Sequence, residues 1–172
     1  MSAQSLPKDL LEQAEFLASR EPKRPKQASL RRAVSTSYYA LFHLLNAEGV
    51  ALLAPNVDEQ TQHRMRRWFD HGVMNEICGR FLPSNLSSPL KELIGTSASS
   101  DLQLVARNFI QLQEARHQAD YDTSLTFTRT QAQALIQQAQ DAFISWGRIR
   151  KSSEANVFIL SLVLWKNWEK RS

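Results

Sequence analysis

One stretch of the sequence, residues 28–48, carries large apolar side chains at the spacing of an α-helix. Successive members are separated by steps of four, four, three and four residues, which places them on one face. Tyr39 and Phe42 widen this face. A face this broad is typical of the central helix of a bundle, which other helices cover on several sides. The apolar stripe consists of Leu30, Val34, Tyr38, Leu41 and Leu45.

Four long segments of the chain show the helical period, and residues that break helices are scarce. Only 5 Gly and 6 Pro occur in 172 residues, and no segment shows the sustained alternation of a strand. We therefore predict an all-α protein, an antiparallel bundle of four to five helices with short connections. The predicted helices span 7–19, 28–48 with Gly49 as the stop, 59–81, 101–119 and 128–149, with a short helix over 90–94 and a capping box at Thr128-x-x-Gln131.

The last part of the sequence is an apolar extension of the predicted bundle. We expect residues 1–152 to form the bundle and residues 153–172 to form a tail. The run from Val157 to Trp165 is nearly unbroken in apolar residues, which makes it too hydrophobic to remain in water. It is also shorter than the ~20 residues that cross a bilayer. The tail is therefore expected to pack on the bundle, or on a dimer or partner surface.

Charge and composition restrict the compartment and the chemistry. Lys and Arg number 21 against 17 Asp and Glu, a net charge of +4, which is compatible with contact to RNA or DNA without requiring it. Cys78 is the single cysteine, so an internal disulfide and a zinc site built mainly on thiolates are excluded. The first residues have no secretory pattern. We expect a cytoplasmic protein without membrane contact, metal ion or cofactor.

Positive charge is concentrated just before and within the start of the predicted helix 28–48. Two interpretations stay open. A run of charges is most often a solvated surface. A track of Lys and Arg can instead follow an RNA backbone, which makes binding sensitive to salt. The candidate RNA-binding residues are Lys23, Arg24, Lys26, Arg31 and Arg32.

A group of polar residues lies where the apolar face of the predicted helix 101–119 ends. Arg116 continues this face, and Asp120 follows one turn later. Because a guanidinium that faces a core requires a partner, we expect the two to pair. The pair can be structural, or the group can form a site that faces phosphate or RNA, where Arg binds phosphate and His or Tyr moves protons. The same helix end also carries His117, Tyr121 and Asp122.

The predicted helix 28–48 also carries a line of polar residues. Ser35, Tyr39 and His43 follow one another at steps of four, so they share one side of the helix. A histidine in such a place is more often a satisfied core residue than a catalyst. A role for His43 as a proton carrier depends on whether this side faces Arg116 in the bundle.

Two motifs resemble the signatures of HEPN domains, which occur in prokaryotic toxin–antitoxin and defence systems. Residues 31–43 are similar to a second-helix signature that reads Arg-Ala-x-Ser-x-x-Tyr-Tyr-Ala-x-Phe-His. Residues 116–122, with the pattern Arg-x-x-Ala-Asp-Tyr-Asp, resemble a second signature of the same branch, at the end of a later helix. The order and separation of the motifs also fit, and the resemblance covers about residues 6–149.

This resemblance implies a bundle that is often a homodimer and is frequently encoded beside a nucleotidyltransferase. Many HEPN proteins are ribonucleases that need no metal, in which an Arg and a His assist attack of a ribose 2′-hydroxyl on the adjacent phosphate. If this chain cleaves RNA, Arg116 is the candidate for phosphate stabilisation. His117, Tyr121 and His43 are then the candidate proton carriers. The candidates that support them are Asp120, Asp122, Ser35 and Tyr39.

The sequence departs from the ribonuclease pattern at the expected histidine. The corresponding positions after Arg116 hold Tyr121, Asp122 and Thr123. His117 is adjacent to the arginine and therefore points about 100° away from it around a helix. Two functions stay open. The first is binding or metal-independent cleavage of RNA. The second is a non-catalytic interaction module that docks on a nucleotidyltransferase or another effector.

Overall fold

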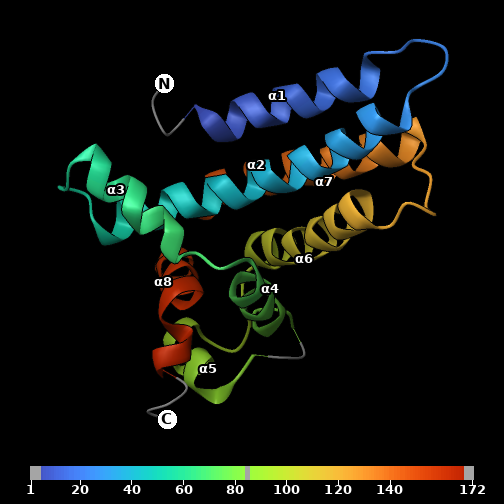
Figure 1. Cartoon of the computed structure of the whole chain (residues 1–172). Helices are drawn as coiled ribbons and strands as arrows, with labels where there is room; N and C mark the ends of the chain where they lie inside the picture. Colours follow the sequence, from blue (N-terminus) through green and yellow to red (C-terminus); the bar gives the residue numbers. More distant parts are fainter. Residues whose placement is uncertain (1–4, 84–85, 169–172) are drawn as a thin grey trace. The chain divides into compact units, whose positions relative to one another are not determined.

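The computed structural model describes residues 5–83 and 86–168, and the regular structure in these ranges is entirely helical (Figure 1). The all-α class expected from the sequence is thus confirmed for them. None of the helices described is long and apolar enough to cross a membrane. The elements are α1 (Leu6–Ser19), α2 (Gln27–Leu53), α3 (Glu59–Met65), the 3-10 helix η1 (Arg66–Trp68), α4 (His71–Arg80), α5 (Ser88–Ile94), α6 (Ser100–Tyr121), α7 (Arg129–Ile149) and α8 (Ser153–Trp168).

The chain divides into two compact units. Unit 1 comprises Met1–Leu44 and Asn108–Ile144, and unit 2 comprises Leu45–Arg107 and Ser145–Ser172. The helices α2, α6 and α7 therefore each contribute residues to both units. The boundary after residue 152, expected from the sequence between a bundle and a tail, stays a prediction.

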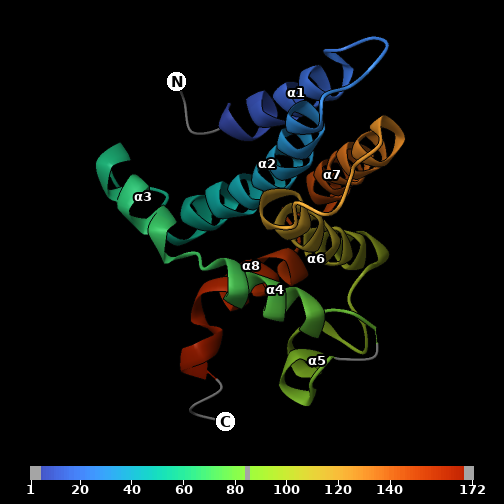
Figure 2. The ribbon, with the colours of Figure 1, turned by 45° about the vertical axis from the view of Figure 1, so that its right-hand side comes forward.

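Unit 1 contains α1, the first part of α2, the last part of α6 and most of α7. In both ribbon views α1 and α2 lie side by side and antiparallel (Figures 1 and 2). Many core residues are alanines, which allow helices to approach closely, and larger apolar side chains fill the remaining space. One core cluster consists of Ala14, Ala18, Leu30, Ala33, Val34, Ala115, Ala119, Phe127, Ala132 and Ile136.

Two side chains connect the loops of unit 1. The amide of Gln27 pairs with the backbone of Phe127: its Nε2 donates to the carbonyl oxygen at 2.8 Å, and its Oε1 accepts from the amide nitrogen at 2.8 Å. Arg129 donates to the carbonyl oxygens of Glu21 and Pro22. The loop between α1 and α2 and the loop between α6 and α7 are thereby held at the ends of their helices.

Unit 2 buries the apolar part of the tail. Helix α8 packs against α4 and α5. The ring of Phe158 meets that of Phe81 edge-to-face, with 5.1 Å between centroids, and lies 6.2 Å from that of Trp146. The Arg80 guanidinium lies 4.7 Å from the centroid of the Trp165 ring. The apolar run expected to need a cover is thus largely buried within one unit, and residues 169–172 of the tail lie outside the described part.

The predicted end of the helix at Gly49 is wrong, because α2 continues to Leu53. Gly49 serves close packing instead of a turn. A Cβ atom at this position would lie 2.2 Å from Cζ of Phe69. The glycine therefore lets an aromatic ring rest on the helix backbone, a role that sequence spacing alone does not distinguish from a stop signal.

The predicted helix 59–81 is interrupted, because α3 and η1 are separated from α4. At the break Asp70 has an extended backbone, with φ −95° and ψ 129°, and its Oδ1 accepts a hydrogen bond of 2.9 Å from the amide of Val73. This N-cap satisfies an amide at the start of α4. The apolar period continues through the break because Phe69 and Ile77 are buried on both sides of it.

The remaining helix boundaries lie close to those expected. The short helix expected over 90–94 is present as α5, which begins at Ser88, and α6 extends to Tyr121 instead of ending at Ala119. The capping box at the start of α7 is confirmed. The amide of Thr128 donates to Oε1 of Gln131 at 2.8 Å, and the amide of Gln131 donates to Oγ1 of Thr128 at 3.2 Å.

Candidate functional site

Arg116 lies on α6 in unit 1, and its guanidinium is held between α2 and the end of its own helix. The side chain is 19% exposed. Its Nη2 donates a hydrogen bond of 2.7 Å to the hydroxyl of Tyr39. Its Nε lies 3.1 Å from Oδ2 of Asp120, in an orientation that gives an ion pair and not a hydrogen bond. The expected pairing of Arg116 with Asp120 is therefore confirmed.

Three aromatic rings surround this guanidinium. Its central carbon lies 5.8 Å from the ring centroid of Tyr38, 5.4 Å from that of Tyr39 and 5.9 Å from that of Tyr121. Such contacts stabilise a cation that has lost part of its hydration. The hydrogen bond to Tyr39 raises the pKa of Arg116 above its usual value and outweighs the opposing effect of burial. The site therefore holds a permanent positive charge in a fixed orientation.

Asp120 connects α6 to α2 through a second contact. The hydroxyl of Ser35, which is buried, donates to Oδ2 of Asp120 at 3.3 Å. The same oxygen is the one that faces Arg116. We name these four residues, Ser35, Tyr39, Arg116 and Asp120, the Arg116 network. Two helices far apart in the sequence thus supply two residues each.

His43 lies beside the Arg116 network, one helical turn after Tyr39 on α2. Its ring is stacked on that of Tyr39 with 6.3 Å between centroids, and it meets the ring of Phe42 edge-to-face at 5.3 Å. The side chain is half-buried. The structure therefore places His43 next to the residue that hydrogen-bonds Arg116.

His117 and Tyr121 form a separate pair on the exposed surface of α6. Their ring centroids are 5.0 Å apart, and Tyr121 is 65% exposed. Tyr121 is the connection between this pair and the Arg116 network, because its ring also lies near the guanidinium. An imidazole and a phenol, the two kinds of proton carrier considered from the sequence, therefore both lie at this end of α6.

Asp122 belongs to the loop after α6. Its Oδ1 accepts hydrogen bonds from the Ser124 hydroxyl at 2.5 Å and from the Ser124 amide at 2.9 Å. These bonds lower the pKa of Asp122 below its usual value. Of the two carboxylates expected near Arg116, Asp120 contacts the guanidinium and Asp122 organises a turn.

Arg31 closes the C-terminal end of α6. Its Nη1 donates to the carbonyl oxygen of Ala119 at 2.9 Å, and its Nη2 donates to that of Asp122 at 2.8 Å and to that of Leu125. The last carbonyl groups of a helix lack partners within it, so an arginine there satisfies several at once. The other four basic candidates, Lys23, Arg24, Lys26 and Arg32, are exposed.

Sequence reasoning missed two of these contacts, the Tyr39–Arg116 hydrogen bond and the capping by Arg31. A signal for both was present. Arg31, Ser35, Tyr39 and His43 follow one another at steps of four along α2. The first three contact the loop after α6, Asp120 and Arg116 in that order. One polar line of α2 therefore faces the end of α6 in antiparallel register.

The described residues contain no cluster of three or more His, Cys, Asp or Glu side chains that could hold a metal ion. Comparison with known proteins finds no match to the chain among family models, curated proteins or solved structures.

Proposed function

We propose that the chain is a HEPN-type protein of a toxin–antitoxin or defence system that binds RNA at the Arg116 network and cleaves it without metal. One observation carries the proposal. Tyr39 and Asp120 hold the Arg116 guanidinium through Nη2 and Nε, while its Nη1 donates no hydrogen bond to the described residues. A fixed guanidinium with a remaining donor is suited to a phosphate oxygen.

The chemistry follows from the groups beside Arg116. A base removes the proton of a ribose 2′-hydroxyl, and the resulting oxygen bonds to phosphorus. The bond from phosphorus to the 5′-oxygen then breaks, and an acid protonates that leaving group. Arg116 would stabilise the charge that develops on the phosphate. His43, His117 and Tyr121 are the candidates for the two proton transfers.

The experiment measures cleavage of end-labelled RNA in EDTA by the parent chain and by R116A. We expect the parent to cleave and R116A to lose activity by about 100-fold or more, since loss of one charge-stabilising donor costs this much in other enzymes. R150A is the matched control, because Arg150 forms an ion pair of 2.8 Å with Glu48 in unit 2. No cleavage by folded parent protein, or equal cleavage by parent and R116A, would remove the ribonuclease proposal.

A second candidate function is a non-catalytic module that docks on a nucleotidyltransferase, with a homodimer as its own assembly. It is favoured by Asp120, which already neutralises the charge of Arg116, and by His117, whose ring faces Tyr121. Light scattering on the purified chain, alone and mixed with a nucleotidyltransferase encoded beside it, tests this candidate. A stable complex without RNA cleavage supports it, whereas a monomer that forms no complex contradicts it.

A further inference from the structure

A surface of unit 2, outside the Arg116 network, combines unpaired positive charge with an exposed indole. It follows the end of α3 and the 3-10 helix η1. Arg64 and Arg67 are exposed, Arg66 is half-buried, and Trp68 is 60% exposed. We name Arg64, Arg66, Arg67 and Trp68 the basic–aromatic turn. The neighbouring apolar residues Met65 and Phe69 are buried, so the tryptophan is the large apolar residue that this turn leaves in solvent.

The arginines of this turn carry charge that the protein itself does not neutralise. Within the described ranges, none of the three forms an ion pair. The nearby aspartates serve as helix caps. Asp58 accepts from the amide of Thr61 at 3.0 Å and from its hydroxyl at 2.7 Å, and Asp70 accepts from the amide of Val73. The charge of the turn is therefore available to an external anion.

The backbone of the turn is fixed on both sides of its exposed residues. The buried side chain of Asn46 donates a hydrogen bond of 2.9 Å from Nδ2 to the carbonyl oxygen of Arg66. On the other side, the Phe69 ring is seated on Gly49 of α2. Arg67 and Trp68 are thus exposed between two anchors and not on a loose loop. A fixed aromatic surface loses little conformational freedom when it binds a ligand.

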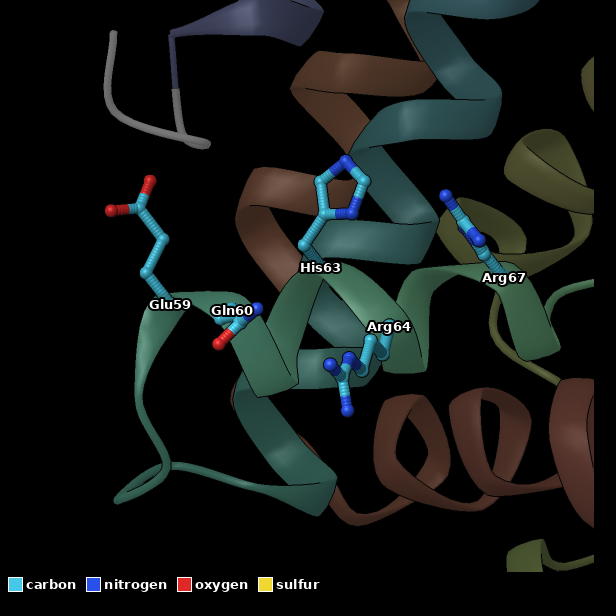
Figure 3. Close-up of a pocket in the computed structure, with 5 residues that line it drawn as sticks. All are labelled: Glu59, Gln60, His63, Arg64 and Arg67. Carbon is cyan, nitrogen blue, oxygen red and sulfur yellow. The ribbon is translucent and has the colours of Figure 1, made fainter.

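The surface beside the turn is hollowed. Side chains of α3 and η1 line an open depression of about 530 Å³, in the range of sites that hold small ligands. In Figure 3, His63 and Arg67 project to the same side of the ribbon. The lining residues are Glu59, Gln60, His63, Arg64 and Arg67. Two arginines of the turn therefore border a space large enough for a phosphate and part of a nucleotide.

We propose that the basic–aromatic turn binds single-stranded nucleic acid, with Arg64 and Arg67 on backbone phosphates and Trp68 stacked on an unpaired base. Sequence-tolerant single-strand binding combines these two features, because every base offers a face for stacking and every phosphate carries charge. A duplex would present the same charge but no free base face. The proposal is separate from the function proposed for Arg116, since it concerns residues of unit 2.

The test measures binding of fluorescein-labelled oligouridine, oligothymidine and a duplex, each of about 12 nucleotides, by fluorescence anisotropy. We expect the parent to bind at least one single strand more tightly than the duplex, and W68A to weaken this binding by about tenfold or more. The double variant R64A/R67A should weaken it too and lower the slope of log affinity against log salt by about 0.7 for each phosphate that the protein no longer neutralises. The matched controls are R107A/K151A, which removes two exposed charges of unit 2, and F16A, which removes an exposed ring of unit 1.

Tryptophan emission gives a direct readout of stacking. Trp146 and Trp165 are buried, whereas Trp68 is exposed. With Trp168 replaced by phenylalanine in every protein compared, quenching of the solvent-exposed emission by oligouridine should disappear in W68A. The variant W68F should retain most of the affinity without this quenching, since phenylalanine also stacks. Equal affinity of W68A and F16A, equal binding of duplex and single strand, or equal binding of polyglutamate would each overturn the proposal. R116A should leave the Trp68 signal unchanged, so the two proposals fail separately.

Discussion

At the scale of single residues, Arg116 can lie near the core because each part of its guanidinium has a different neighbour. Nη2 has a hydroxyl acceptor in Tyr39, Nε has a carboxylate in Asp120, and aromatic rings surround the group. A charged group that loses water without such partners destabilises a fold strongly. The hydroxyl of Tyr39 is the one contact that can be removed while the charge, the ring and the carboxylate all stay.

The substitution Y39F is therefore expected to lower the free energy of unfolding by about 1.5–3 kcal/mol, the usual contribution of a hydrogen bond to a charged group. Urea denaturation measures it. Y121F is the matched control. The Tyr121 ring also lies near Arg116, but its hydroxyl forms no hydrogen bond with the described residues, so the free energy should change by less than about 0.5 kcal/mol. Equal effects of the two variants would contradict the role assigned to Tyr39.

The stabilisation that the ionised Asp122 contributes to the fold is expected to depend on pH. Its folded pKa lies below the unfolded value because Ser124 donates hydrogen bonds to it. This stabilisation is therefore complete above the unfolded pKa of about 4, and it is lost as pH falls through the lower folded pKa. Carboxyl chemical shifts followed by NMR should give a lowered pKa for Asp122 that returns toward its usual value in S124A. Asp58, whose pKa is lowered by Thr61, should keep its value in the same variant.

The sequence predicted the residue types of the Arg116 network but not all of their contacts. The pairing of Arg116 with Asp120 follows from spacing on one helix, so it was predictable. The contacts of Ser35 and Tyr39 depend on the register between α2 and α6, which the packing of the whole unit sets. The polar line along α2 indicates which side of the helix meets polar partners, but it does not indicate which residue of α6 each of its members contacts.

At the scale of elements, the helices of the chain were predictable and their ends were less so. The stripe on α2 is buried as expected, and the capping box opens α7. Gly49 and Asp70 show why the ends of helices were predicted less well. A glycine can end a helix or admit a neighbouring ring, and an aspartate can be one exposed residue of a helix or the cap of the next. Contacts from distant residues decide between these roles.

Replacing glycine by alanine is expected to change the stability of the protein in opposite directions at Gly49 and Gly147. G49A should destabilise the protein by about 1–3 kcal/mol, because the new methyl group would overlap the Phe69 ring and the packing must shift. G147A in α7 should stabilise it by about 0.5–1 kcal/mol, since alanine favours a helix and nothing lies within 4 Å of its Cβ. Thermal unfolding of the two variants compares them. A stabilising G49A would show that Phe69 does not rest on the helix backbone.

Substitutions at Arg31 test whether this basic residue at the start of α2 has a structural role or an RNA-binding role. R31K keeps the charge but cannot reach several carbonyl groups with one planar fork, so it should destabilise the protein by about 1–3 kcal/mol. R32K changes the neighbouring exposed arginine and should have little effect. Hydrogen exchange should also show faster amides after the end of α6 in R31K alone. Unchanged exchange there would contradict the capping role.

At the scale of the whole molecule, the chain forms two units from helices that alternate between them. The boundary between the two units falls after Leu44, within the continuous helix α2. The other two boundaries likewise fall within α6 and α7. No linker in the sequence indicated this division, because the chain passes from one unit to the other within helices and not within loops. The apolar tail was recognisable as a segment that needs a cover, but its cover in unit 2 depends on Phe81 and Trp146, which lie far away in sequence.

The tail therefore belongs to the folded core of unit 2, and two residues of α8 test this directly. Phe158 is fully buried against the rings of Phe81 and Trp146, so F158A should lower the free energy of unfolding by about 3–5 kcal/mol. Leu164 on the same helix is 44% exposed, and L164A should cost less than about 1 kcal/mol. Urea denaturation compares the two variants, with near-ultraviolet circular dichroism as a readout of aromatic packing. Similar small effects of both variants would mean that residues 1–152 fold without α8. In that case α8 would only cover a partner surface, and F158A would remove no packing within the chain itself.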